Sequence, residues 1–384
     1  MANMAHAQET FKKGTVLDSI AVSNSNGETF TLYLPESYAV EKLNPIVFIF
    51  EPAARGFIGI SPFLEASEKY GYVLVCSNNA RNGPYDRNFD IANRLFDHIF
   101  ANFKIKEDEM YISGLSGGSR LATAIASLTD RFTGVVACGA GFSHIQEHMP
   151  STQNFVYAGL CGDRDMNYKE MLGNVDYFGL IKFNSTLITF DGEHTWPPQS
   201  QILRAFDWLN TKKLIKNNPS RLDDILLKYQ SDYKTTKEFE KKGAYLFASE
   251  AYDRMIQTYD KVIKSDSLKE QHQELKKSKS YIKQEKSLTA ALELETELKK
   301  KLDPRLLKDL EDVGRANLKW WNKEVEKLNK LKENGDAEIK KMVYRLKFGL
   351  FVRVYSRKNK LLYNSTPEQA KLVDDFIQLF YPKK

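Results

Sequence analysis

The sequence predicts an α/β domain with a mainly parallel sheet, followed by an all-α domain. In the first 210 residues, short β-rich segments alternate with segments whose apolar residues recur every three or four positions. This alternation is typical of a parallel sheet with helices on its faces. From about Asn217 glycine and β-branched residues become rarer, and long segments rich in Lys, Glu and Leu take over. The charge changes too, from 16 basic and 23 acidic side chains in residues 1–210 to 40 and 27 in the remainder.

Eight segments of the first domain are predicted to be strands. The first two alternate apolar and polar residues, so we expect them to be antiparallel, whereas the later ones are apolar throughout, as strands covered on both faces must be. Helices are predicted between them at 86–103 and 118–128. The strand segments are 16–24, 29–35, 45–52, 72–78, 110–116, 132–140, 154–162 and 185–193.

The second half is predicted to be helical. Breaks are expected at Gly243, at Asp303-Pro304, and at the sequences ENGD and NSTPEQ, where Thr366 is a helix N-cap and Pro367 occupies the first helical position. The expected helices lie near 220–241, 244–264, 267–300, 304–333, 337–357 and 366–380. We therefore predict a disordered segment at 1–14, an α/β domain at 15–214 and a basic all-α domain at 215–384.

Composition excludes several classes of protein. No run of 18 apolar residues is present, so no membrane-spanning helix is expected. Cys76, Cys138 and Cys161 lie in apolar strand-like segments, which indicates buried thiols and neither a disulfide framework nor a zinc motif. Ala5-His6-Ala7 has the small-x-small form of a signal-peptidase site, which favours an exported protein.

The motif Gly114-Leu115-Ser116-Gly117-Gly118 ends a predicted strand and opens a predicted helix. This context is typical of a nucleophile elbow, in which the serine occupies a cramped turn and the flanking residues must lack a Cβ atom. The alternative is a plain turn or a phosphate-binding loop. The lysine of a P-loop and the spacing of a dinucleotide-binding loop are both absent, which favours the elbow.

A serine nucleophile needs a base, and the base needs a carboxylate to orient it. In the elbow fold these partners follow the serine in the order acid, then histidine. His194 follows the last predicted strand, where the base is needed. Asp163 and Asp165 follow the preceding strand, and we prefer Asp165, since Asp163 can cap the next helix.

Oxyanion donors are expected from two loops. The first is the backbone N–H of Gly117, next to the nucleophile. The second should come from the loop after the third strand, FEPAARG, in which Pro52 has no N–H, so Ala53 is the expected donor and Ala54 the alternative. His144 and His148 share an i, i+4 spacing but have no third ligand nearby, so no metal and no cofactor are expected.

The runs GLSGGSRLA, GDRDMNY and GEHTWPP together resemble the α/β-hydrolase branch that contains polyhydroxybutyrate depolymerase-like and feruloyl esterase-like carboxylesterases. The resemblance covers about residues 15–212. It implies an α/β-hydrolase sandwich and a triad of Ser116, Asp165 and His194, with Gly162 to Asp165 as the matching acid turn. The chain departs from this branch at Glu51-Pro52, which replaces the usual His-Gly of the oxyanion loop.

The helical half resembles a tetratricopeptide repeat weakly, through Gly243, Tyr245, Ala248 and Tyr252, but no repeat of about 34 residues follows. Its lysines are interleaved with glutamates, which is typical of solvated helix faces, so no nucleic-acid partner is expected. A protein- or polyanion-binding helical module is the favoured interpretation.

These observations predict a serine esterase that cleaves a small-molecule or polymer-borne ester through an acyl-enzyme. Two alternatives stay open. One is a catalytically weak hydrolase-fold scaffold whose helical half binds protein or glycan, which Glu51-Pro52 favours. The other is a serine peptidase, because peptidases use the same acyl-transfer groups.

Overall fold

The computed structural model describes residues 11–150, 154–361 and 366–382 and divides into two compact units. Of the described residues, the first unit contains 11–150, 154–162, 170–231 and 257–263, and the second contains 163–169, 232–256, 264–361 and 366–382. The chain therefore passes between the units several times. The domain boundary at 214/215 stays a prediction, and Ala5-His6-Ala7 lies outside the described residues.

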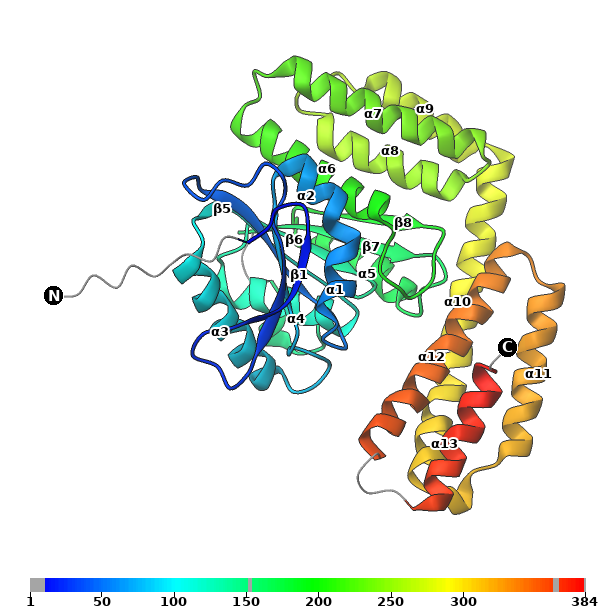
Figure 1. Ribbon diagram of the computed structural model, residues 1–384. Coiled ribbons are helices and arrows are strands. Elements are labelled where there is room, and N and C mark those ends of the chain that lie inside the picture. The colour runs from blue at the N-terminus through cyan, green and yellow to red at the C-terminus, as the bar shows by residue number, and fades with distance from the viewer. Residues whose placement is uncertain (1–10, 151–153, 362–365, 383–384) are drawn as a thin grey trace. The chain divides into compact units, whose positions relative to one another are not determined.

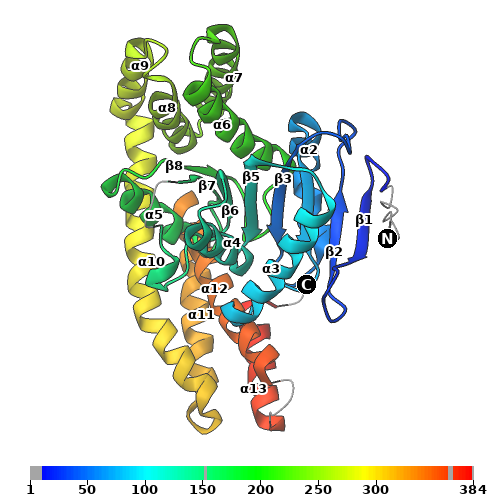
Figure 2. The ribbon, with the colours of Figure 1, turned by 90° about the vertical axis from the view of Figure 1, so that its left-hand side faces the viewer.

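An eight-stranded sheet forms the centre of the first unit, with the order β1-β2-β4-β3-β5-β6-β7-β8. β1 and β2 lie at one edge and β7 and β8 at the other (Figure 2). β2 pairs antiparallel with β1 and β4, and all the other pairs are parallel. This confirms the predicted α/β-hydrolase fold and all eight strands. Their bounds are β1 Val16–Ala21, β2 Thr29–Tyr33, β3 Asn44–Phe50, β4 Val73–Ser77, β5 Ile105–Leu115, β6 Gly134–Cys138, β7 Val156–Gly162 and β8 Ser185–Phe190.

Helices cover both faces of this sheet (Figure 1). One face packs against α3 (Tyr85–Asn102), α4 (Gly117–Thr129) and α5 (Tyr168–Leu180), whose apolar residues share a core cluster with the strands. The other face packs against α1 (Gly56–Ile60), α2 (Leu64–Tyr70) and α6 (Gln199–Asn217). Two separate cores therefore hold the strand ends in fixed positions, and Cys76, Cys138 and Cys161 are buried as predicted.

Residues 11–14 pack onto the sheet unit, although the sequence predicts a disordered segment there. The Phe11 ring stacks on Phe103 with centroids 6.1 Å apart, and the Gly14 N–H donates to the Leu34 carbonyl over 2.8 Å. Residues 11–14 are thus part of the packed sheet unit.

The C-terminal half is helical, as predicted (Figure 1). Buried residues of the last four helices form one core around the indole of Trp321, whose side chain is fully buried. The helices are α7 Leu222–Lys241, α8 Tyr245–Tyr259, α9 Asp266–Lys277, α10 Lys279–Glu311, α11 Leu318–Asn334, α12 Ala337–Leu361 and α13 Pro367–Phe380. The capping box that Thr366 forms with Gln369 confirms the predicted start of α13.

The predicted break at Asp303-Pro304 is wrong. α10 continues through Pro304, and the break lies instead at Ser278, which ends α9 and accepts a hydrogen bond from the Tyr281 N–H as the N-cap of α10. The single helix expected at 267–300 is therefore two helices, and the one expected at 304–333 is the end of α10 plus α11.

Burial explains why α10 tolerates its proline. A proline inside a helix removes one backbone hydrogen bond and costs about 3 kcal/mol. Leu302 and Leu306, on either side of Pro304, are at most 1% exposed in the helical core. Burying two leucine side chains contributes about 3–6 kcal/mol, which exceeds that cost.

Among the residues that the structure describes, no helix combines the length and the apolar character needed to cross a bilayer.

Candidate active site

Ser116 occupies the turn between β5 and α4, with φ +54° and ψ −118°. A serine rarely adopts positive φ, so the surrounding structure must impose this conformation. Hydrogen bonds fix both sides of the residue: its N–H donates to the Cys138 carbonyl over 2.8 Å, and its carbonyl accepts from the Arg120 N–H over 3.1 Å. This is the strained turn that the motif predicts.

The flanking glycines are sterically required. A Cβ atom on Gly114 would lie 2.3 Å from the backbone of Gly118, and one on Gly118 would lie 2.0 Å from the carbonyl oxygen of Phe50. Both neighbours are backbone atoms, which cannot give way cheaply. Strand β5 and helix α4 therefore approach as closely as the elbow interpretation requires.

His194 faces the serine. Its Nε2 atom lies 2.9 Å from Ser116 Oγ, a hydrogen-bond distance across 78 residues of sequence. His194 follows β8 by four residues, and both side chains are only partly buried, so a substrate can approach the pair. A neutral imidazole that accepts at Nε2 can remove the serine proton.

The segment that carries the predicted acid starts beside the loop of the base. Gly162, the last residue of β7, pairs with Phe190 at the end of β8. A Cβ atom on Gly162 would lie 2.4 Å from the carbonyl oxygen of Gly192, two residues before His194. Asp165 comes three residues after Gly162.

Asp165 is buried, with 1% of its surface exposed, and its Oδ1 atom accepts from the Asn167 N–H over 2.8 Å. The neighbouring Asp163 has a different environment, because its Oδ2 atom lies 2.9 Å from the Lys341 ammonium. Because it is paired with Lys341, the Asp163 carboxylate is suited to anchoring its segment to α12. The assignment of Asp165 to the triad stays a prediction.

The oxyanion loop is organised around Glu51, whose side chain is fully buried. One carboxylate oxygen accepts from the Ala53 N–H over 2.7 Å and from the Arg55 N–H over 3.0 Å, and the other pairs with the Arg55 guanidinium. The Ala54 N–H donates to the Glu51 carbonyl over 3.0 Å. Ala53 therefore stays a predicted oxyanion donor. Its N–H must release the Glu51 carboxylate before it can donate to the oxyanion of a substrate.

The backbone N–H of Gly117 is the other predicted oxyanion donor. Gly117 is the first residue of α4, where the helix itself supplies no carbonyl partner for the backbone N–H. The positive end of the helix dipole adds to the attraction for an oxyanion.

Asn82 is a neighbour of this site that the sequence analysis missed. A Cβ atom on Gly117 would lie 1.9 Å from Asn82 Oδ1, so the carboxamide covers the residue after the nucleophile. The Asn82 N–H donates to the Pro52 carbonyl over 2.9 Å, which ties this loop to the oxyanion loop. No motif marks Asn82, because its position depends on two loops that are distant in sequence.

The comparisons with known proteins give structural similarity only. No protein-family model matches the chain, and no curated protein matches it by sequence. About half of the chain is similar to solved serine hydrolases and esterases.

Three of these structures illustrate the sequence identity, the TM-score and the coverage. The fluorophosphonate-binding serine hydrolase F of Staphylococcus aureus is 17% identical, with a TM-score of 0.43 over 51% of this chain and 97% of that one. The S-formylglutathione hydrolase of Staphylococcus aureus is 19% identical, with a TM-score of 0.41 over 51% and 95%. A feruloyl esterase module of Clostridium thermocellum is 11% identical, with a TM-score of 0.42 over 50% and 87%.

The two other histidines that the sequence analysis considered, His144 and His148, have separate environments. His148 is buried and lies 2.8 Å from Ser143 Oγ through its Nδ1 atom, and burial lowers the pKa of its imidazole. His144 is exposed. Within the described part of the chain, no cluster of three His, Cys, Asp or Glu side chains is suited to holding a metal ion.

Proposed function

We propose that the chain is a serine hydrolase that cleaves carboxylic esters through an acyl-enzyme. The observation that carries the proposal is the 2.9 Å contact between Ser116 Oγ and His194 Nε2, made by a serine held at positive φ on a strand-to-helix turn. That combination directs a hydroxyl outward and places a base on it.

In the proposed reaction, His194 Nε2 takes the Ser116 proton while Oγ attacks the ester carbonyl carbon. The tetrahedral oxyanion accepts a hydrogen bond from the Gly117 N–H, and Ala53 is the predicted second donor. The alcohol leaves with the proton from His194, and water then attacks the acyl-enzyme by the same route. Asp165 is proposed to orient His194 and to stabilise its imidazolium.

Fluorophosphonate labelling of the purified chain, together with p-nitrophenyl acetate turnover, tests this proposal. Labelling should be lost in Ser116→Ala, and turnover should fall about 10³-fold or more. Ser113→Ala is the matched control, because Ser113 lies on the same strand and its hydroxyl donates to the Val136 carbonyl. Undiminished turnover in Ser116→Ala contradicts the proposal.

A second candidate is a hydrolase-fold scaffold of weak activity whose helical half binds protein or glycan. The Glu51 carboxylate supports it, because this group occupies the Ala53 N–H and places negative charge beside the oxyanion position. A wild-type chain that resists labelling, and a Glu51→Gln variant that labels, would favour the scaffold. Rapid wild-type labelling favours the enzyme.

A further inference from the structure

The segment Asp163–Lys169 follows β7 and includes the first two residues of α5, yet it belongs to the same compact unit as the C-terminal helices. It is a tight turn, since the Tyr168 N–H donates to the Asp165 carbonyl over 2.9 Å. It also carries Asp165, the predicted acid. The groups that hold this segment therefore bear directly on the proposed triad.

Arg345, in the middle of α12, contacts both ends of the segment. Its Nη1 atom donates to the Asp163 carbonyl over 2.8 Å, and its guanidinium lies 5.2 Å from the centre of the Tyr168 ring. Its Nε atom donates to Glu295 of α10 over 2.8 Å. The side chains of Arg345 and Glu295 are both fully buried.

A buried guanidinium is costly to desolvate, and a buried ion pair seldom adds stability beyond what an apolar pair would give. A buried arginine in this position therefore suggests a purpose other than stability. The planar, multidentate guanidinium can fix a carbonyl, a carboxylate and an aromatic face at once, which a hydrophobic side chain cannot do.

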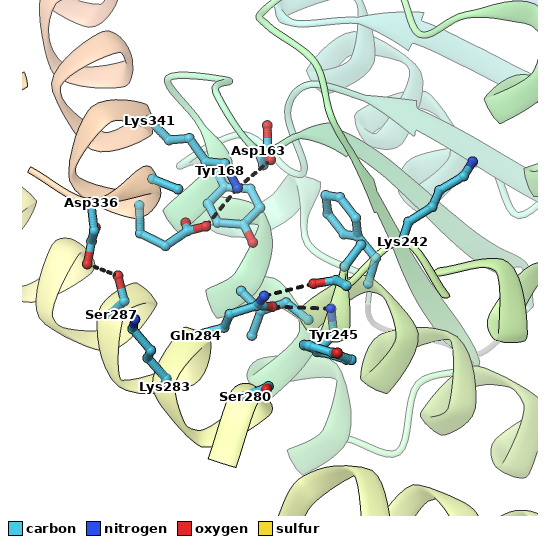
Figure 3. Close-up of a pocket in the computed structure, with 16 residues that line it drawn as sticks. Asp163, Tyr168, Lys242, Tyr245, Ser280, Lys283, Gln284, Ser287, Asp336 and Lys341 are labelled. Atoms are coloured by element: carbon cyan, nitrogen blue, oxygen red, sulfur yellow. Dashed lines mark hydrogen bonds and ion pairs between the residues drawn. The ribbon is translucent and has the colours of Figure 1, made fainter. Parts of the chain in front are cut away.

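Lys341 adds a second clamp one turn earlier on α12. Its ammonium lies 2.9 Å from Asp163 Oδ2 and 2.7 Å from Glu338 Oε1, and Figure 3 shows the side chain reaching Asp163. Burial alone would lower the pKa of Lys341, but the hydrogen bond to Glu338 and the charge of Asp163 together raise it. The ammonium therefore stays charged at neutral pH.

Two more lysines tie the segment to α10. Lys169 donates to the Leu292 carbonyl over 3.1 Å and also to the Thr296 hydroxyl. Lys299 donates to the Met166 carbonyl over 3.4 Å. Three cationic side chains of α10 and α12, those of Lys299, Lys341 and Arg345, therefore contact this segment of seven residues, and its own Lys169 contacts α10.

We propose that α10 and α12 fix the segment that carries the catalytic acid, and that Arg345 and Lys341 are positioning residues for Asp165. The inference depends on the proposed serine-hydrolase function. It gives the helical half a direct role in catalysis, in addition to any partner that it binds.

A pocket of about 600 Å³ beside the clamp makes the test possible. Lys341, Asp163 and Tyr168 line it together with Lys283 (Figure 3). Because Lys341 borders open space, Lys341→Met replaces the ammonium without overpacking. Lys283 lines the same pocket from α10, and its side chain is exposed, so Lys283→Met is the matched control.

The experiment compares the full-length Lys341→Met, Arg345→Lys, Arg345→Met and Lys283→Met chains in p-nitrophenyl acetate hydrolysis across pH, with melting temperatures measured in parallel. We expect kcat to fall about 10-fold in Lys341→Met and about 100-fold in Arg345→Met, with KM changed less than about twofold. Arg345→Lys should recover part of the loss, because it keeps the charge but not the fork of donors. Lys283→Met should match the wild type.

The pH profile separates positioning from mere structural support. Withdrawal of the Asp165 carboxylate removes a negative charge that favours the protonated base, so the acid limb of kcat/KM should move to lower pH in Lys341→Met. Loss of a lysine charge alone would move that limb the other way. A structural role would lower the melting temperature and leave the limb in place.

Unchanged kcat and an unchanged acid limb in Lys341→Met overturn the inference, even if the Arg345 variants fail to fold. Two further variants identify which proposal has failed. If Ser116→Ala retains activity, the proposed function fails and the inference fails with it. If Ser116→Ala and Asp165→Asn are both impaired while Lys341→Met is normal, the inference alone is wrong.

Discussion

Gly118 lies against Phe50 so closely that a methyl group on the glycine would sit 2.0 Å from the phenylalanine carbonyl oxygen. The start of α4 is thus packed directly on the end of β3, and the Ser116 turn depends on that contact.

Gly118→Ala should destabilise the chain by about 2 kcal/mol or more, because the clash is with backbone and cannot be relieved by rotating a side chain. Urea unfolding measures the change. The matched control is Gly173→Ala in α5, where an added Cβ atom meets nothing within 4 Å. It should stabilise the chain by up to about 1 kcal/mol. Equal effects of the two substitutions would refute the packing argument.

Asp165→Asn should lower kcat by about 10³- to 10⁴-fold, because an amide holds the histidine in the wrong tautomer. Asp163→Asn should cost less, since Asp163 acts through Lys341 and the segment. Steady-state kinetics on folded protein, verified by circular dichroism, distinguish the two. A larger loss in Asp163→Asn would reverse the assignment of the acid.

Pro304→Ala should stabilise the chain by about 2 kcal/mol. Alanine restores a helix hydrogen bond in α10, a gain of about 3 kcal/mol that is reduced by about 1 kcal/mol for the more flexible unfolded chain. The proline side chain is exposed, so the substitution leaves no cavity. Chemical denaturation checks the prediction, and an unchanged or lower stability would show that the proline serves the helix.

The Glu109 carboxyl should make the free energy of unfolding depend on pH. Burial would raise the pKa of this carboxyl, but its hydrogen bonds with Lys106 and Lys213 lower it below the ordinary value of 4.5. A lowered folded-state pKa stabilises the fold above the unfolded pKa, and this contribution is lost as pH falls through the folded value. The contribution is about 0.5–1 kcal/mol for such a partly exposed group.

Unfolding free energies of wild type and Glu109→Gln between pH 3 and 7 test this prediction. The wild type should be more stable at pH 7, and the difference should disappear at pH 3. A difference that is independent of pH would indicate packing and not charge.

Features of the structure that depend on local sequence patterns were predicted correctly for the strands and for the serine–histidine pair. Apolar–polar alternation marked the first two strands and apolar runs marked the other six, and the order of Ser116 and His194 along the chain identified a pair that the fold brings into contact. The break expected at Pro304 was wrong, because local propensity was overridden by the burial of neighbouring leucines. Glu51 could be seen as an unusual residue, but the capture of the Ala53 N–H by its carboxylate depends on the conformation of the turn.

The contacts of Asp163–Lys169 with α10 and α12 could not be predicted from the sequence, for a different reason. They join positions separated by more than 100 residues, and no spacing rule connects a basic residue in a helix to one particular loop. Only the three-dimensional path of the chain identifies them.

The separation of Arg345 from Asp163 has a consequence for biogenesis. The two residues are 182 positions apart, so the ribosome must add that length of chain after the acid segment emerges before its buried anchor exists. At ordinary synthesis rates this takes roughly 10–40 s. Ser116 is made before that interval and His194 is added early in it, while the acid segment still has no anchor. The anchor of the predicted acid is therefore complete only after Arg345 has been added, long after Ser116 and His194.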